Sequence, residues 1–184
     1  MKLYMIMLGC RPKRRFTEQH DIFFGIANSL KDLVPEMKAF WPEAEGIMHV
    51  DVWREVTVVN NYKIEVIARS EIYNQDLQLF FINLGGYKEN EFEEYHYKML
   101  TVADTISEAT KKSKETSFYK HCGFQGAISH IDDKYGIDVD DLYNVKEILN
   151  ERYKDNYSLR ISKSEGLLPN DQLHIGYLKL DKIV

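Results

Sequence analysis

The chain has 184 residues, of which 44% are hydrophobic and 12% aromatic, and it carries a formal charge of −5 at pH 7. This composition is typical of a globular protein with one sizeable core or two small ones, and no segment approaches the roughly 20 apolar residues that a membrane span requires. The acidic balance argues against nucleic acid as a partner, because proteins that bind it usually present a basic face.

The chain is predicted to begin with two strands that flank a charged loop. The first covers residues 3–8, a run of aromatic and long apolar side chains. It is followed by Gly9, where we expect a turn that uses the freedom of glycine at positive φ. The charged loop covers residues 10–17, and the second strand covers residues 20–27.

A helix is predicted over residues 30–41, because its apolar side chains recur with the spacing of a core-facing stripe. Ser29 is a natural N-cap for this helix. Pro35 would delete a hydrogen bond inside it, so we expect either a kink or a late start near Val34. Two further strands follow, one around His49 and one over residues 62–67, whose alternation suits a half-buried strand.

The first part of the chain is repeated in the second. A shift of 76 positions aligns residues 3–30 with residues 79–106 without a gap, and eight pairs are identical. A shift of 81 positions matches Ile47, His49 and Asp51 with Ile128, His130 and Asp132. These matches predict a tandem duplication, in which each repeat is one supersecondary unit packed against its copy.

The second repeat is predicted to contain strands over 79–84 and 96–103 and a helix over 106–119 that begins after Thr105. The counterpart of Tyr62 is ambiguous, since either Tyr143 or Tyr157 could take its place. We favour Tyr157, which makes residues 133–155 an insertion that is partly helical from Val145 to Tyr153. Residues 173–180 then form a closing strand, which blunts an open sheet edge.

The sequence therefore predicts an α+β fold built from a tandem duplicated β-β-α-β-β unit. The strands form a largely antiparallel sheet with the helices on one face, and an extra C-terminal strand completes it. The first repeat covers residues 1–72, and the second covers residues 73–184 with the insertion and the closing strand. We expect the two repeats to pack as one compact body.

Histidines and carboxylates form the best candidates for a functional site. Positions i and i+2 of a strand project to the same side, so each Glu-x-His or His-x-Asp pair can meet a common partner. If the two strands of a repeat are neighbours, the pairs form a cluster suited to a divalent metal or to acid–base chemistry. The alternative is that each carboxylate only fixes a histidine and ties strands together. The candidates are Glu18, His20, His49 and Asp51, with their copies Glu94, His96, His130 and Asp132.

The two long loops have opposite charge. The first contains four cations that could hold a phosphate or carboxylate, namely Arg11, Lys13, Arg14 and Arg15. The second, over residues 88–94, carries four acids and one lysine. The two loops could face each other within one chain or across a homodimer, or they could be solvated hairpin tips.

The two cysteines, Cys10 and Cys122, do not belong to the repeated framework and favour a reduced, cytoplasmic setting. Cys10 stands beside arginines that could lower the pKa of its thiol and make it a nucleophile. Glycine occupies the repeat-equivalent position, so a small inert turn residue is the alternative that we favour.

The opening residues 3–12, the stretch 17–21, the segment 29–35 and the His-x-Asp strands together resemble a bacterial family known as domain of unknown function 1543. The resemblance covers about residues 1–145. That family is similar in having one or two copies of its domain per chain. It implies a soluble bacterial protein, and it assigns no activity or catalytic residue.

Two functions follow as hypotheses. The first, which we prefer, is a non-enzymatic binding or interaction module for a small anionic molecule or a protein partner. The second is a metal-dependent, hydrolase-like enzyme, in which Glu18, His20, His49 and Asp51 act as ligands or acid–base groups. The loop cations, including Arg11, would then orient an anionic substrate.

Overall fold

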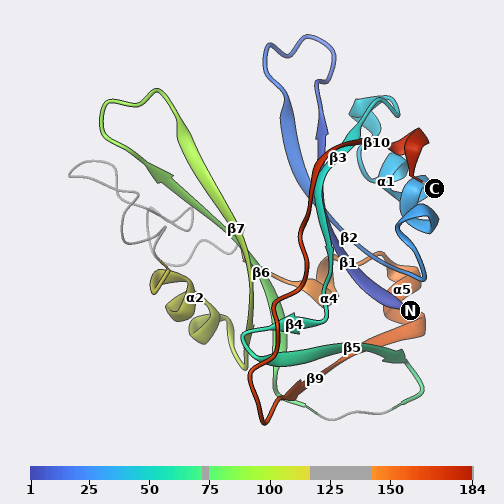
Figure 1. Ribbon diagram of the computed structural model, residues 1–184, viewed down its shortest axis with the longest axis vertical. Coiled ribbons are helices and arrows are strands. Elements are labelled where there is room, and N and C mark those ends of the chain that lie inside the picture. Colours follow the sequence, from blue (N-terminus) through green and yellow to red (C-terminus); the bar gives the residue numbers. More distant parts are fainter. Residues whose placement is uncertain (72–74, 117–141, 184) are drawn as a thin grey trace. The chain divides into compact units, whose positions relative to one another are not determined.

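The structure is a computed structural model that describes residues 1–71, 75–116 and 142–183 (Figure 1). The chain divides into two compact units. Unit 1 comprises Met1–Ile72 and Leu149–Val184, and unit 2 comprises Tyr73–Ile148. Every strand pairing in the described part is antiparallel and the helices are short, which confirms the α+β class.

The main sheet of unit 1 has the strand order β10-β3-β1-β2. Its strands are β1 (Lys2–Cys10), β2 (Gln19–Ala27), β3 (His49–Glu55) and β10 (His174–Lys179). One face of β1 is buried over residues 4–8, because Tyr4, Ile6 and Leu8 alternate along the strand and are all buried. The C-terminal strand β10 covers the edge of β3, so the end of the chain closes this side of the sheet.

Short helices connect β2 to β3. They are η1 (Leu30–Leu33), α1 (Val34–Phe40) and η2 (Pro42–Ala44). The carboxylate of Asp32 accepts a hydrogen bond from the backbone N–H of Ser29, which fixes the start of η1. Pro35 lies in the first turn of α1, where its missing N–H removes no helical hydrogen bond. Of the two alternatives for Pro35, the late helix start is therefore correct.

A second sheet of unit 1 has the order β4-β5-β9 and contains β4 (Val58–Val59), β5 (Tyr62–Ala68) and β9 (Tyr157–Lys163). Asn60 and Asn61 join β4 to β5 with positive φ at both residues, as a tight two-residue hairpin turn requires. Helix α5 (Glu151–Asn156) leads into β9. The C-terminal segment lies in unit 1 because β9 pairs with β5 and β10 pairs with β3.

Unit 2 is built on the hairpin of β6 (Gln78–Tyr87) and β7 (Glu94–Ala103), with β8 (Leu142–Asn144) on the other edge of β6. Helix α2 (Ile106–Lys114) packs on the hairpin, and α4 (Val145–Ile148) follows β8. The hydroxyl of Thr105 accepts from the N–H of Glu108 and caps α2. The core of this unit contains Phe80, Ile82, Leu84, Ala103, Ala109 and Leu142.

The two hairpins share one register. Lys2 pairs with Ala27 in unit 1, and Gln78 pairs with Ala103 in unit 2, which are the same positions after the shift of 76 residues. The strands of the described residues form three sheets, each within one unit, where the sequence analysis expected a single sheet.

Part of the predicted second repeat lies outside the described residues. This applies to His130, Asp132, residues 133–141 of the insertion and residues 117–119 of the predicted helix. In the part of the chain that the structure covers, no helix combines the length and apolarity needed to cross a membrane.

Candidate functional site

The candidate site of unit 1 is centred on Gly9. This residue pairs with His20 on β2 and with His49 on β3, so the three residues form one row across neighbouring strands. Residues directly opposite each other in antiparallel strands project their side chains to the same face. The cluster predicted from the sequence was conditional on the two His strands being neighbours. In the structure β1 lies between them and contributes a glycine.

Irregular pairing on both sides of β3 places Asp51 beside this row. The register with β1 shifts so that Leu8 pairs with Val50 and Met7 with Val52, which leaves Asp51 as the extra residue of a bulge. On the other side, β10 is irregular between Ile175 and Leu178. Bulges re-aim side chains and are frequent next to functional sites. Here the bulge turns the Asp51 carboxylate towards the two histidines.

Glu18, His20, His49 and Asp51, hereafter the quartet, approach one another closely. Asp51 Oδ1 lies 3.2 Å from Nε2 of His49, and its Oδ2 lies 3.3 Å from Nε2 of His20. Glu18 Oε1 lies 3.3 Å from Nε2 of His49, and its Oε2 lies 3.8 Å from Nε2 of His20. Each carboxylate therefore faces both imidazoles, and the four groups form a closed ring.

The close approaches within the quartet lack hydrogen-bond geometry. Within the described residues, neither His49 Nε2 nor Asp51 Oδ2 has a hydrogen-bond partner, although both atoms are buried. The side chain of His49 is only 5% exposed, while those of Glu18 and His20 are 46% and 38% exposed. A buried polar atom without a partner is costly, so His49 Nε2 calls for an explanation.

Gly9 is required by close approach and not by a turn. It lies inside β1 and pairs with a residue on each neighbouring strand, which corrects the expectation of a turn at positive φ. A Cβ atom at this position would lie 2.5 Å from Asp51 Oδ2 and 2.5 Å from His49 Nε2. Only glycine leaves room for the two side chains to meet above the strand.

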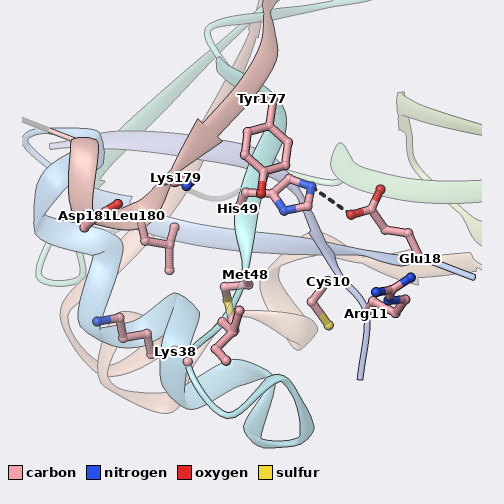
Figure 2. Close-up of a pocket in the computed structure, with 12 residues that line it drawn as sticks. Cys10, Arg11, Glu18, Lys38, Met48, His49, Tyr177, Lys179, Leu180 and Asp181 are labelled. Atoms are coloured by element: carbon pink, nitrogen blue, oxygen red, sulfur yellow. Dashed lines mark ion pairs between the residues drawn. The ribbon is translucent and has the colours of Figure 1, made fainter. Parts of the chain in front are cut away.

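A pocket of about 600 Å³ opens beside the quartet, and two of its lining residues, Glu18 and His49, are quartet members (Figure 2). The volume is within the range of small-molecule sites. The charged side chains of the lining are three cations, Arg11, Lys38 and Lys179, and two acids, Glu18 and Asp181. Cys10, Gly46, Ile47, Met48, Tyr177 and Leu180 complete the lining.

Tyr177 covers His49 at the pocket wall. The two rings are stacked with their centroids 4.0 Å apart, and Figure 2 shows the Tyr177 ring against the imidazole while the Glu18 carboxylate approaches from another side. Gly176 has a φ of 143°, a conformation that favours glycine and lets β10 bulge at this point. This local irregularity brings Tyr177 over the histidine.

The four loop cations have different surroundings. Arg11 lines the pocket. Lys13 forms an ion pair with Glu45 at 2.8 Å and does not line the pocket. Arg14 has a φ of 65° in the connection between β1 and β2, and Arg15 is exposed in that connection without lining the pocket. Of the four, Arg11 is therefore placed to meet a ligand in the pocket.

Cys10 is buried at the pocket, and its environment corrects the idea of an activated thiol. Burial raises the pKa of the Cys10 thiol, and the nearby carboxylates of Glu18 and Glu43 raise it further. The neighbouring arginines do not reverse this direction. Since the thiolate is the nucleophile, the environment favours the inert form.

The second copy of the candidate site is described only in part. His96 lies opposite Gly85 on β6, as His20 lies opposite Gly9, and its side chain is exposed. Glu94 accepts a hydrogen bond from the hydroxyl of Tyr87 at 2.9 Å. His130 and Asp132 lie outside the described residues, so their relation to His96 is not part of the structure.

Sequence reasoning missed several residues of the site. Tyr177, Lys38 and Lys179 line the pocket, and no motif distinguishes them from ordinary surface residues. The sequence singled out Gly9 as a turn residue and not as part of the site. The identity of Gly9 and Gly85 in the two hairpins was the one signal that a glycine is needed opposite the histidine.

The quartet is not a completed metal centre as it stands. Among the residues that the structure describes, no three His, Cys, Asp or Glu side chains are arranged as a set of metal ligands. The longest approach within the ring is the 3.8 Å between Glu18 and His20, the two most exposed members. His49 and Asp51 are the more buried members of the ring.

Comparisons with known proteins find a family model that matches part of the chain and a solved structure with a similar fold. Residues 15–66 match the Domain of Unknown Function (DUF1543), a segment that contains all four quartet residues. This match supports the family resemblance. No curated protein matches the chain. The chain is similar in fold to a crystal structure of protein Il1583 from Idiomarina loihiensis, with a TM-score of 0.64 and 19% identity over 97% of each chain.

Proposed function

We propose that unit 1 binds a small anionic molecule in the pocket beside the quartet. The observation that carries this proposal is a pocket of about 600 Å³ whose three cations, Arg11, Lys38 and Lys179, exceed its two acids by one positive charge. The chain as a whole carries a charge of −5, so the pocket differs in sign from the average surface. Charge-assisted hydrogen bonds from arginine or lysine are the usual means of holding a carboxylate or phosphate.

The aromatic and apolar lining of the pocket supports a ligand with a flat apolar part. Tyr177 and His49 offer stacked rings at one wall, and Ile47 is 80% exposed at the pocket. Ligand pockets are generally lined by apolar and aromatic groups with a few polar groups that fix orientation. We therefore infer a ligand that carries a carboxylate or phosphate on a small organic body.

The experiment that tests this proposal is titration calorimetry of the full chain with inorganic phosphate, pyrophosphate and citrate. We expect at least one of these probes to bind, and we expect Arg11→Ala to weaken binding about tenfold or more, because it removes a charge-assisted bond. The matched control is Arg15→Ala, which removes the same charge from the same loop outside the pocket. Absence of binding by all three probes, or equal weakening by both variants, would reject the proposal.

A second function, metal-dependent hydrolysis of a small anionic substrate, is favoured by one observation. Glu18 and His49 belong both to the quartet and to the pocket lining, so a bound ligand would lie beside possible acid–base groups. Hydrolysis of p-nitrophenyl phosphate with added zinc or manganese, compared between the natural chain and His49→Ala, tests this function. Equal rates for the two proteins would exclude it for this substrate.

We also propose that the two units descend from a duplicated hairpin-and-helix unit in a bacterial cytoplasmic protein. The shared register of β1–β2 and β6–β7 supports the duplication. The free, buried Cys10 supports a reduced setting. A homodimer and a protein partner are further predictions. Light scattering of the purified chain would test the dimer.

A further inference from the structure

We propose that the quartet of Glu18, His20, His49 and Asp51 binds one divalent transition-metal ion of the zinc type. The inference is independent of anion binding in the pocket, because the metal is expected to bind with no anion present.

The first support is the spacing of the donor atoms. Four donors bound to one zinc ion at about 2.0–2.1 Å in a tetrahedron lie about 3.3 Å from one another. Three of the four N–O approaches in the quartet are 3.2, 3.3 and 3.3 Å, and the fourth is 3.8 Å. Three of the four nitrogen–oxygen approaches therefore match the separation of two ligands on one ion, and each carboxylate makes its two approaches with different oxygens.

The second support is the direction of the groups. A hydrogen bond between an imidazole and a carboxylate is directed along the N–H bond. His49 Nε2 lies 3.2 and 3.3 Å from two carboxylate oxygens, yet neither contact is a hydrogen bond and no other described atom provides one. The ring nitrogen is therefore buried beside two carboxylates, and no described atom uses its bonding capacity.

The third support is the burial and fixation of His49. Its side chain is 5% exposed and is covered by the stacked ring of Tyr177. An unpartnered nitrogen in such a position costs free energy unless something occupies it. Gly9 adds to this argument, because the absence of a Cβ leaves room for His49 and Asp51 above the strand.

The positions of the four side chains explain why the quartet does not have the geometry of a finished metal site. His49 and Asp51 are held by β3 and its bulge, whereas Glu18 and His20 are partly exposed and lie at and before the start of β2. A small rotation of these two side chains would shorten the 3.8 Å approach. Imidazole and carboxylate donors together suit zinc and related divalent ions.

The test is metal binding by the tag-free full chain, stripped with a chelator and titrated with ZnSO4 in calorimetry and with CoCl2 in visible spectroscopy. We expect one high-affinity ion in unit 1, a rise in melting temperature with zinc, and Co²⁺ absorption bands of a low-coordinate site. His49→Ala should lower the affinity of this site by at least about 100-fold, since loss of an outer partner of a ligand alone costs 10- to 100-fold.

The matched control is His174→Ala, which removes a histidine of the same sheet that stacks on Trp53 outside the quartet. If His49→Ala does not fold, Glu18→Gln replaces it, because Glu18 is partly exposed and its loss leaves the core intact. The proposal is overturned if neither Zn²⁺ nor Co²⁺ binds. It is also overturned if the quartet variants bind as tightly as His174→Ala. Titration of the metal-free chain with phosphate tests the anion proposal separately. Phosphate binding without metal binding would reject only the metal site, and metal binding without phosphate binding would reject only the anion site.

Discussion

At the residue scale, Gly9 explains why the candidate site can exist on a sheet. In most strands a side chain would project from the centre of a row of three residues and separate its neighbours. Here the central residue has no side chain, and His49 and Asp51 occupy the space that a Cβ would fill. The site therefore depends on the absence of one methyl group.

Substitution Gly9→Ala is expected to lower the free energy of unfolding by about 1–3 kcal/mol, the usual cost of forcing an extra methyl group into a packed site. The added Cβ would displace His49 or Asp51, so binding at the quartet should be lost as well. Urea unfolding measures the first effect. Gly166→Ala is the control, because a Cβ there meets no atom within 4 Å. Equal stability of the two variants would contradict the packing argument.

At the element scale, a polar contact joins α1 to α5 within unit 1. The hydroxyl of Tyr153 donates to Oε1 of Glu36 at 2.6 Å, and Arg152 also donates to that oxygen. Tyr153 is 3% exposed. Burial raises the pKa of Tyr153 to about 12, and the hydrogen bond to Glu36 contributes in the same direction. The neutral phenol is therefore part of the contact between the two helices.

This pKa predicts a loss of stability at high pH. A raised pKa in the folded state stabilises the fold below the ordinary value of 10, and this contribution is lost as pH rises from 10 to 12. The loss amounts to about 2–3 kcal/mol. Tyr153→Phe should be less stable than the natural chain at pH 8 by about 1 kcal/mol, and this difference should fall to zero and then reverse between pH 10 and 12, because the loss in the natural chain exceeds it.

Urea unfolding at pH 8, 10 and 11 measures this effect. Tyr177→Phe serves as the control, since its ring is 66% exposed and it also loses one phenol. A difference between Tyr153→Phe and the natural chain that stays constant over this pH range would contradict the argument.

At the scale of the whole molecule, the two ends of the chain build unit 1 together. Strand β9 pairs with β5, and β10 pairs with β3, although about 90 to 130 residues separate the partners in the sequence. Asp171 adds to this closure, because its carboxylate accepts from the N–H and the hydroxyl of Thr57. The C-terminal segment also supplies Tyr177 and Lys179 to the pocket.

Removal of residues 173–184 is therefore expected to damage unit 1 selectively. The truncated chain should lose anion binding and show faster amide hydrogen exchange in β1 and β3, because β3 becomes an open edge and His49 loses its cover. Exchange in β6 and β7 should stay unchanged, since these strands pair only within unit 2 among the described residues. Unchanged protection of β3 would contradict this view.

The sequence by itself determined most of the individual elements. Apolar runs, alternation and the repeat located β1, β2, β5, β6 and β7 to within three residues at each end, and β1 and β6 are longer than predicted because Gly9, Gly85 and Gly86 lie inside them. Pro35 indicated either a kink or a late start of the helix, and the structure has the late start. These features depend on local preferences and on the shift of 76 residues, both of which can be read along the chain.

The sequence also determined which residue types gather at the site, since Glu18, His20, His49 and Asp51 were singled out together. Their arrangement was decided only in the tertiary structure. Strand order placed Gly9 between the two histidines, and irregular pairing placed Asp51 and Tyr177. Non-local pairing and bulges depend on the fit of whole sheets, which no local pattern encodes. For the same physical reason, only the tertiary structure revealed that the end of the chain completes the pocket.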